Sequence, residues 1–466
     1  MNDLVTDNPF DVSETIVAQA TAAGRGALSI VRLSGPEAHA IARAAVDRWP
    51  AEARSATVSH VRDASAAEID QSVIIRYDAP ASFTGEDSVE LITHGGLVVA
   101  TTVVAALIAR GARLARPGEF TRRAVLNGKL DVLQAEATGD LVNAKSRAAQ
   151  GVALRQLDGG LSRRVLALRD ELIGLEALIA YDIDFPEEDD GPIAPARILA
   201  AAERIVTALE QLLATSRTGE LVREGALVVL AGAPNVGKSS LFNALIGEAR
   251  AIVTEIPGTT RDAIEAVIDT PTIPLRLVDT AGIRDALDPV ERLGVEVSES
   301  YVARAAVVLV CGDNDDSIMR LKGAMSGPAP APVIVVRTKA DLATPTTADL
   351  ASNCATLGAS TAVAVSAETG EGLAVLLSTI VEVVSGEAGV QQVDAPLLTQ
   401  ERHRYAVGRS LEEVRAFRDC WAGKKIPAPV AAVHLREAVT TLEDLIGAVD
   451  VEDVLDEVFR RFCVGK

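Results

Sequence analysis

The spacing of apolar and polar residues divides the chain into stretches of different secondary structure. In residues 1–128, short runs rich in β-branched residues are mixed with one helical pattern. These runs predict strands at Ala27–Leu33, Ser72–Tyr77 and Ser88–Thr93, and a helix at Leu97–Arg110 that ends at Gly111. We therefore expect an α/β domain in the first segment.

Later stretches carry Leu, Ala and Val at helical spacing, with charged residues on the opposite face. The first runs from Lys129 to about Ile183 without a proline, and an acidic, proline-bearing turn at residues 182–192 ends it. A further helix is predicted at Arg197–Leu221. The same pattern returns at Leu397–Arg418 and Val430–Phe462. We interpret these stretches as two halves of one helical domain.

Between the two halves, short apolar runs alternate with helical stretches and turn residues. This order is typical of a mostly parallel sheet with helices on both faces. The predicted strands are Leu227–Ala231, Leu275–Asp279, Val307–Cys311, Val333–Arg337 and Ala362–Ser366. The simplest architecture is an α/β domain inserted into a helical domain, with segments at 1–128, 129–224, 225–384 and 385–466.

Composition narrows the class of protein. The 466 residues include 45 basic and 65 acidic side chains, giving a formal charge of −20, and 48% of residues are apolar. The apolar fraction excludes a disordered chain. The longest stretch without Asp, Glu, Lys or Arg, residues 91–109, is interrupted by His94 and the Gly95-Gly96 pair, so we expect no membrane span. The first residues are unlike a signal peptide because they include Asp3, Asp7, Asp11 and Glu14.

The cysteines indicate neither a disulfide framework nor a zinc knuckle, since no two form a Cys-x-x-Cys pair. They are Cys311, Cys354, Cys420 and Cys463. We therefore expect a soluble, reduced, cytoplasmic protein. Acidic residues outnumber basic ones in each of the four segments, which argues against a nucleic-acid binder.

The segment from Gly232 to Ser239 (Gly-Ala-Pro-Asn-Val-Gly-Lys-Ser) follows an apolar strand and opens a helix. This is the context of a phosphate-binding P-loop. Glycines let backbone N–H groups turn toward the phosphates, and the helix N-terminus adds its positive end. We expect Lys238 at the β- and γ-phosphates and Ser239 at Mg²⁺.

Further motifs follow in the order of a guanine-nucleotide switch. Asp279-Thr-Ala-Gly282 ends a strand, where a carboxylate can reach Mg²⁺ through water and a glycine amide can face the γ-phosphate. Residues 258–262 (Gly-Thr-Thr-Arg-Asp) offer Thr260 as a second Mg²⁺ ligand. Thr338-Lys-Ala-Asp341 ends another strand, and its aspartate can accept both the N1–H and the amine of guanine. Ser366-Ala367 follows the last strand and backs the base with an amide.

Two positions depart from the usual pattern of GTPases. The guanine-reading turn begins with Thr338 where Asn is usual, which loses an amide hydrogen bond but leaves Asp341 in place. Directly after Asp-Thr-Ala-Gly stands Ile283, where many GTPases have a glutamine that orients the attacking water. A catalytic carboxylate must therefore come from elsewhere.

Motifs outside the P-loop segment extend along the whole chain. They are Glu14-Thr-Ile-Val-Ala-Gln-Ala-Thr-Ala-Ala-Gly-Arg-Gly, Ser82-Phe-Thr-Gly-Glu-Asp, His94-Gly-Gly, Ala115-Arg-Pro-Gly-Glu-Phe-Thr-Arg-Arg-Ala, Gly128-Lys-Leu-Asp-Val-Leu-Gln-Ala-Glu-Ala and Phe462-Cys-Val-Gly-Lys466. Together they resemble the tRNA-modification GTPase family MnmE, also called TrmE. The last resembles the family's Cys-Ile-Gly-Lys ending, with Val in place of Ile.

The resemblance implies a Ras-like G domain that is activated by potassium and dimerises across the nucleotides. Asn235 matches the family residue that coordinates K⁺, and Thr254, Ile256 and Thr259 belong to the matching loop that closes over the ion. A monovalent cation there neutralises charge that develops on the phosphates. Glu291 matches the catalytic glutamate.

The expected GTP-binding residues belong to the motifs described above and to the loop that closes over the ion. They are Asn235, Val236, Gly237, Lys238, Ser239, Ser240, Thr254, Thr259, Thr260, Asp279, Thr280, Ala281, Gly282, Lys339, Asp341, Ser366 and Ala367.

The resemblance also implies that the N-terminal α/β domain binds tetrahydrofolate and forms a constitutive homodimer. Family folate contacts match Arg32, Glu90, Lys129 and Lys466. A carboxylate suits the donors of a pterin, and cations suit the carboxylates of folate. On sequence alone, a cysteine such as Cys463 more often serves as a small apolar packing residue. The resemblance implies instead that it is a site residue whose pKa Lys466, close in sequence, would lower.

The implied reaction adds an aminomethyl-type group to C5 of the wobble uridine of certain tRNAs. The family works with a flavoprotein partner, MnmG, and joins a one-carbon unit from formyl- or methylene-tetrahydrofolate to glycine or ammonia. GTP hydrolysis drives conformational change in the complex.

Two alternatives stay open at this point. One is a GTPase switch in RNA or ribosome assembly without folate chemistry. The other is a folate enzyme whose G domain barely hydrolyses GTP.

Two basic clusters stand out within the acidic chain. One comprises Arg110, Arg113, Arg116, Arg122, Arg123 and Lys129, and the other Arg402, Arg404, Arg409, Arg415, Arg418, Lys424 and Lys425. We expect any direct contact with tRNA to use these clusters, to be weak, and to fall steeply with salt.

Overall fold

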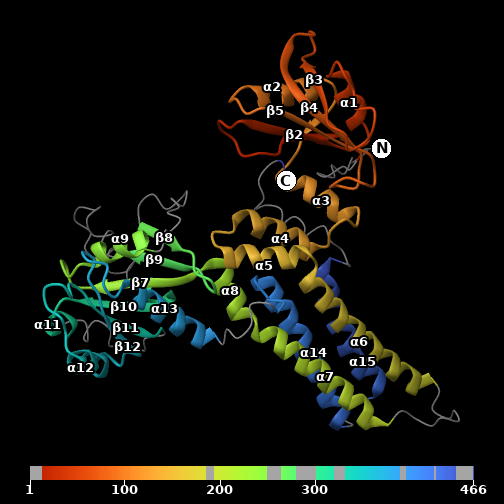
Figure 1. The fold of residues 1–466 in the computed structure, drawn as a ribbon. Coiled ribbons are helices and arrows are strands. Elements are labelled where there is room, and N and C mark those ends of the chain that lie inside the picture. The colour runs from red at the N-terminus through yellow and green to blue at the C-terminus, as the bar shows by residue number, and fades with distance from the viewer. Residues whose placement is uncertain are drawn as a thin grey trace, which may run out of the picture. The chain divides into compact units, whose positions relative to one another are not determined.

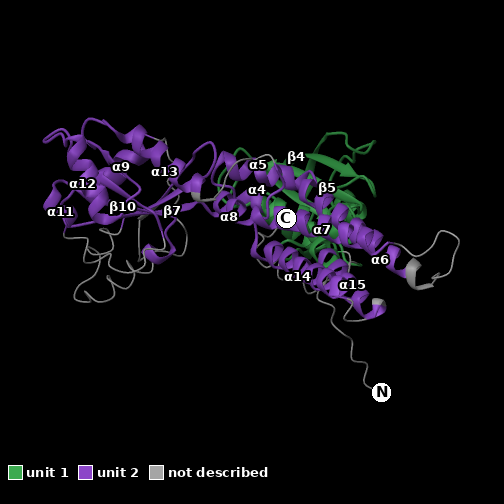
Figure 2. Cartoon of the chain, turned by 90° about the horizontal axis from the view of Figure 1, so that it is seen from below, with its two compact units in different colours: residues 1–139, 443–466 green, residues 140–442 purple. Residues whose placement is uncertain are grey.

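A computed structural model describes residues 13–184, 194–248, 264–279, 301–319, 331–388, 395–423, 427–447 and 465. Figure 1 shows the elements along the chain, and Figure 2 shows two compact units. One unit comprises residues 1–139 and 443–466, and the other comprises residues 140–442. The predicted combination of α/β and helical domains is confirmed.

The first unit contains a six-stranded sheet in the order β3-β4-β5-β2-β1-β6. Its strands are β1 (Ile16–Gln19), β2 (Leu28–Ser34), β3 (Thr57–Arg62), β4 (Glu68–Tyr77), β5 (Ser88–His94) and β6 (Arg113–Leu114). The runs predicted at β2, β4 and β5 are therefore strands. Strands β1, β3 and β6 were not predicted. The four-residue β1 and the two-residue β6 are too short to carry periodicity of their own.

The two faces of this sheet differ in character. Val31, Leu33, Val89 and Leu91 point toward α1 (Ala38–Ala44) and α2 (Val99–Ile108) and form the buried core there. Since successive side chains of a strand point to opposite faces, Arg32 and Glu90 lie on the other face. Phe120 of α3 (Glu119–Leu126) packs with Ile16 and Ala18 in a separate small cluster.

The helical part is discontinuous in sequence, as predicted. Its first half comprises α4 (Val132–Asn143), α5 (Arg147–Leu157), α6 (Gly160–Asp184), α7 (Pro195–Ala214) and α8 (Ser216–Glu224), and its second α14 (Glu401–Gly423) and α15 (Ala428–Ile446). In Figure 1, α14 lies along α7. Gln156 Nε2 also donates to the Leu397 carbonyl oxygen at 2.9 Å. The single helix predicted at Arg197–Leu221 is wrong, because the chain turns at Thr215, between α7 and α8.

The inserted domain contains a sheet in the order β12-β11-β10-β7-β9-β8. Its strands are β7 (Ala226–Gly232), β8 (Ile264–Ile268), β9 (Leu275–Asp279), β10 (Val307–Gly312), β11 (Val333–Arg337) and β12 (Thr361–Ala364). All pairs are parallel except β8 with β9. The mostly parallel sheet is thus confirmed, and β8 is an antiparallel edge strand that was not predicted.

Helices cover both faces of this sheet. On one face, α9 (Lys238–Glu248) and α13 (Leu373–Ala388) pack on side chains that include Val228 and Leu309. On the other, Leu357 of α12 (Thr347–Leu357) packs near Val310. Cys311 is fully buried in β10, and burial raises the pKa of its thiol to about 12. This residue belongs to the strand core, as predicted.

Among the described residues, no helix combines the length and apolar character that crossing a membrane requires.

Candidate functional site

The P-loop joins the end of β7 to the start of α9, so its backbone lies at the carboxyl edge of a parallel sheet, where α/β proteins place ligands. A side chain at Gly232 would meet the carbonyl oxygen of Cys311 on the neighbouring strand, which requires glycine here. Asn235 has a φ of 62°, in the left-handed region. The loop therefore has the tight, irregular backbone that turns N–H groups inward.

Lys238 and Ser239 stand at the first turn of α9 and face the loop and the neighbouring strand. Lys238 Nζ donates to the carbonyl oxygens of Gly232 at 2.9 Å and Ala233 at 2.8 Å. Ser239 Oγ donates to Asp279 Oδ2 at 2.6 Å. Asp279 ends β9, next to β7 in the sheet. Two motifs 40 residues apart in sequence thus meet at one point.

The donor set formed by Ser239 and Asp279 fits Mg²⁺. A hydroxyl and a carboxylate oxygen are the hard ligands that this ion prefers, and a phosphate would complete its shell. Thr260, the other predicted magnesium ligand, lies outside the described residues.

The turn from Thr338 to Asp341 follows β11 and is bonded directly to the P-loop. Thr338 Oγ1 donates to the Val236 carbonyl oxygen at 2.5 Å. Lys339 Nζ donates to the Asn235 carbonyl oxygen and to Asp313 Oδ2, both at 3.0 Å. The hydrogen bond from Lys339 is the main reason why the pKa of Asp313 is lowered.

Asp341 and Ser366 come together from the ends of two neighbouring strands. Ser366 Oγ donates to Asp341 Oδ1 at 2.6 Å, and the amide of Ala340 donates to the Val365 carbonyl oxygen at 3.1 Å. Asp341 itself is exposed. A fixed, accessible carboxylate at this edge can accept the two N–H donors of guanine, and Ala367 follows Ser366 directly.

Several predicted site residues lie outside the described residues. They are the two catalytic candidates Glu291 and Cys463, the loop and strand-end residues Thr254, Ile256, Thr259, Thr260, Thr280, Ala281 and Gly282, and the tail residue Lys466. Of the remaining nucleotide residues, Asn235, Val236, Gly237, Lys238, Ser239 and Ser240 lie in or beside the P-loop, with Asp279, Lys339, Asp341, Ser366 and Ala367 at the ends of the neighbouring strands.

A second polar site lies on the N-terminal sheet, on the face away from α1 and α2. Arg32 on β2 and Glu90 on β5 are direct cross-strand partners. Arg32 Nε and Nη2 both donate to Glu90 Oε1, at 3.0 and 2.7 Å. The structure therefore brings together two of the four predicted folate contacts.

Aromatic residues complete this second site. The Arg32 guanidinium lies 5.3 Å from the Phe83 ring centre and 5.7 Å from that of Phe120, within cation–π range. Tyr77 donates its hydroxyl to Glu90 Oε2 at 3.2 Å. Burial and the charge of Glu90 raise the pKa of Tyr77. Tyr77, Phe83 and Phe120 were not predicted as site residues. Aromatic residues are scarce, 3% of the chain, and this scarcity is a signal that could have pointed to them.

Lys129 bonds the loop of residues 78–87, which carries Phe83. Lys129 Nζ donates to the Pro80 carbonyl oxygen at 3.1 Å, and its stem packs beside Gly85. Gly465 precedes Lys466, the fourth predicted folate contact, in the sequence. It is buried against Gln19 and Ala20 at the end of β1. Gln19 pairs with Val31, the neighbour of Arg32. Gly465 thus lies against the sheet next to the strand that carries Arg32.

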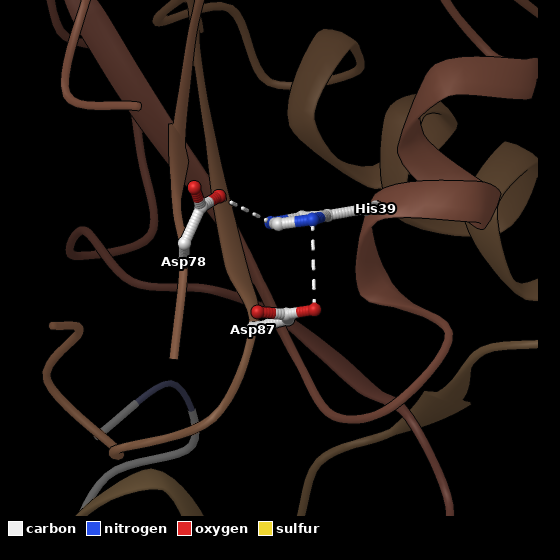
Figure 3. A group of neighbouring side chains, drawn as sticks. All are labelled: His39, Asp78 and Asp87. Carbon is white, nitrogen blue, oxygen red and sulfur yellow. Dashed lines mark ion pairs between the residues drawn. The ribbon is translucent and has the colours of Figure 1, made fainter. Parts of the chain in front are cut away.

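The loop is fixed to α1 by His39, which lies between Asp78 and Asp87 (Figure 3). His39 Nδ1 is 3.6 Å from Asp87 Oδ2, and Nε2 is 3.8 Å from Asp78 Oδ1 and 3.1 Å from the Tyr77 carbonyl oxygen. The two ring nitrogens face different carboxylates, whereas a metal site needs donor atoms that converge on one point. We interpret this group as a set of polar contacts that positions the loop.

Comparison with known families bears on both sites. The family described as GTP-binding protein TrmE N-terminus matches residues 15–129, and the MnmE helical domain matches residues 132–463. The second match alone covers more than half of the chain. The chain belongs to the MnmE family. The resemblance seen in the MnmE motifs is thereby confirmed.

MnmE relatives are similar over almost their whole length. The protein from Heliobacterium modesticaldum is 42% identical over 98% of this chain and 100% of its own, and that from Azoarcus sp. is 42% identical over 97% and 98%. Both are named tRNA modification GTPase MnmE. Among solved structures, the G domain of the T. maritima FeoB iron transporter is 29% identical over 34% of this chain and 98% of its own, with a TM-score of 0.27, too low for a conclusion.

Proposed function

We propose that this protein binds and hydrolyses GTP and that it acts in the modification of tRNA. The observation that carries the proposal is the meeting of the P-loop, the Ser239–Asp279 pair and the turn ending at Asp341 at one sheet edge. Relatives that match nearly the whole chain are named tRNA modification GTPases.

In this proposal each nucleotide residue has a separate task. Lys238 exchanges its bonds with loop carbonyls for bonds with phosphate oxygens. Ser239, with Thr260 and the Asp279 carboxylate, holds Mg²⁺, which neutralises phosphate charge when bound. Asp341 accepts the two donors of guanine. Glu291, outside the described residues, orients the attacking water.

We further propose that K⁺ supports hydrolysis, held by Asn235 with Thr254, Ile256 and Thr259. The left-handed backbone at Asn235 presents this side chain at an exposed tip of the P-loop. GTP turnover measured in K⁺ and in Na⁺ tests the assignment. Faster turnover in K⁺ that is lost in Asn235→Ala supports it, and equal rates in both salts contradict it.

The N-terminal site is proposed to bind a tetrahydrofolate that carries a one-carbon unit, as formyl or methylene. Arg32 and Glu90, which are bonded to each other, contact the pterin, where Glu90 accepts from its donors. Lys129 and Lys466 attract the carboxylates at the other end of the folate. Phe83, which is 40% exposed, offers a flat apolar surface beside Arg32, whereas Phe120 is fully buried and packs on Arg32 from the core. Cys463 is proposed as a thiol of the modification step.

The complete reaction requires partners besides this chain. We propose a homodimer that works with a flavoprotein of the MnmG type and adds an aminomethyl or carboxymethylaminomethyl group to C5 of the wobble uridine. A cytoplasmic location would place it with its tRNA substrate.

Nucleoside analysis of tRNA from cells that lack this protein tests the proposal. The modified wobble uridine should disappear, return with the wild-type gene and with the exposed-surface control Lys145→Ala, and stay absent with Lys238→Ala. An unchanged wobble uridine in the deletion strain would refute the role in modification.

Folate binding by the full-length protein separates this function from the alternative of a GTPase switch without folate chemistry. Titration with 5-formyltetrahydrofolate should show saturable binding that Glu90→Gln weakens by about tenfold, the loss of one charge-assisted contact. The exposed control Glu52→Gln should bind like the wild type. Absence of binding in a protein that still hydrolyses GTP would favour the switch.

A further inference from the structure

We propose that Thr338 is a positioning residue that ties the guanine-reading turn to the P-loop and makes no bond with the base. Guanine is then recognised through N1, N2 and O6 only, and its N7 atom is not read. The inference rests on the proposed binding of GTP and concerns how the base is selected.

The hydrogen of the Thr338 hydroxyl is already bonded within the protein. Thr338 is only 5% exposed, and its Oγ1 donates to the Val236 carbonyl oxygen at 2.5 Å. Its backbone amide donates to the Gly312 carbonyl oxygen at 3.0 Å. A threonine hydroxyl carries one hydrogen, so both donors of this residue are bound to protein carbonyls.

The adjacent lysine, Lys339, also bonds the P-loop. Lys339 Nζ binds the Asn235 carbonyl oxygen and Asp313 Oδ2. Two consecutive side chains of the turn therefore bind two consecutive carbonyl oxygens of the P-loop, at Asn235 and Val236. These two bonds fix the distance between the phosphate loop and the base-reading turn. The side chain of Thr338 therefore holds the turn in place.

Guanine presents hydrogen-bond donors on one edge and acceptors at its other polar atoms. One edge offers the N1–H and N2–H donors, which suit the Asp341 carboxylate that Ser366 holds. The remaining polar atoms, O6 and N7, are acceptors and need donors. An amide after Ser366 suits O6. An asparagine at position 338 would carry two amide hydrogens, one for the Val236 carbonyl and one for N7, whereas threonine has none left.

The test compares GTP with 7-deaza-GTP, which lacks the N7 acceptor, in the full-length protein. Dissociation constants are measured by displacement of a fluorescent guanine nucleotide. The wild type should bind both nucleotides within twofold of each other. Thr338→Asn should prefer GTP by about three- to tenfold, the value of one ordinary hydrogen bond.

Two further variants separate positioning from base reading. Thr338→Ser keeps the hydroxyl and should behave like the wild type. Thr338→Val removes the bond to Val236 and should weaken both nucleotides by the same factor, about five- to a hundredfold, with their ratio unchanged. A change in that ratio would contradict the positioning role.

The possible failures can be told apart. A wild-type preference of fivefold or more for GTP over 7-deaza-GTP would overturn this inference while the proposed function stands. Equal binding of both nucleotides by Thr338→Asn would also overturn it, since position 338 would then not face N7. Absence of any guanine-nucleotide binding would overturn the proposed function and this inference with it.

Discussion

Lys238 and Glu119 are charged residues that are almost completely buried, and each is held by a few defined partners. Lys238 is 6% exposed and bonds two carbonyl oxygens of the P-loop, whereas Glu119 is 2% exposed and bonds Arg113 and the Arg116 amide. Buried charges are costly unless they are paired. Such positions are therefore sensitive to substitution, although for different reasons.

Substitution of Lys238 by Ala should remove nucleotide binding more than it affects the fold. The ammonium is proposed to form charge-assisted bonds with phosphate oxygens, and loss of such bonds corresponds to about 10- to 100-fold in affinity. Titration with a fluorescent GTP analogue measures this change. Lys145→Ala, an exposed lysine of the same unit, is the matched control. Unchanged affinity in Lys238→Ala would remove Lys238 from the phosphate site.

Glu119 should make stability depend on pH. Burial acts to raise the pKa of Glu119, but the hydrogen bonds from Arg113 and the Arg116 amide, with the charges of Arg113 and Arg123, lower it below its ordinary value of 4.5. The folded state therefore favours the charged form. Its stabilising contribution is fully present above pH 4.5 and is lost as the pH falls through the lowered value.

Glu119→Gln tests this pH dependence by urea unfolding between pH 7 and pH 3.5. At pH 7 the variant should be less stable by roughly 3 kcal/mol, because a buried ion pair loses one partner. The difference from the wild type should shrink below pH 4.5. Glu52→Gln, which is exposed, should show no such trend. A constant difference at all pH values would contradict the assignment.

Among the elements, the strands and helices with strong periodicity were predicted and the weak ones were not. Strands β7, β9, β10 and β11 are apolar runs because helices cover both their faces. The edge strands β3 and β8 and the short β1 and β6 were not predicted. The break between α7 and α8 is a tertiary effect, since Thr215 Oγ1 there accepts a hydrogen bond from the distant Leu398 amide at 3.1 Å.

The contact between α8 and residues 397–399 should make replacement of a helical glycine by alanine destabilising. Alanine within a helix is normally more favourable than glycine by up to about 1 kcal/mol. At Gly219, however, a Cβ would overlap the carbonyl oxygen of Leu398. Gly219→Ala should therefore destabilise the protein by roughly 1–3 kcal/mol.

Gly408 in α14 provides the matched control, because a Cβ there meets no atom within 4 Å. Thermal unfolding of the two variants and the wild type measures the change in stability. Gly408→Ala should be neutral or stabilising. If both variants shift stability in the same direction, the packing of α8 on the 397–399 segment is not as described.

For the whole molecule, the position of Gly465 joins the C-terminal motif to the N-terminal sheet. Its φ is +100°, and a Cβ would overlap the carbonyl oxygen of Gln19. Gly465→Ala should therefore displace the tail and weaken folate binding by about tenfold, through the neighbouring Lys466. GTP turnover should stay unchanged. Gly174→Ala, which has open space around it, is the control; normal folate affinity in Gly465→Ala would exclude Lys466 from the site.

The tertiary structure also corrects our expectation about basic clusters. Arg122 and Arg123 are 3% and 2% exposed, so they cannot form an RNA-binding surface. In the second cluster, Arg415 and Arg418 bond Glu210 and Glu203 of α7. Arg123 likewise bonds Glu86. The sequence could not reveal these contacts between elements, because Glu86, Glu203 and Glu210 are far from their arginines in the chain.

The sequence by itself determined the types of domain, the insertion of the α/β domain, the P-loop and the family, because these depend on local periodicity and on motifs of fixed spacing. Only the tertiary structure decided which side chains meet. It placed Ser239 against Asp279, bonded Thr338 to Val236, surrounded Arg32 with Glu90, Phe83 and Phe120, and brought Gly465 to β1. Each of these contacts joins residues that are far apart in sequence, so strand order and packing, rather than any local pattern, created them.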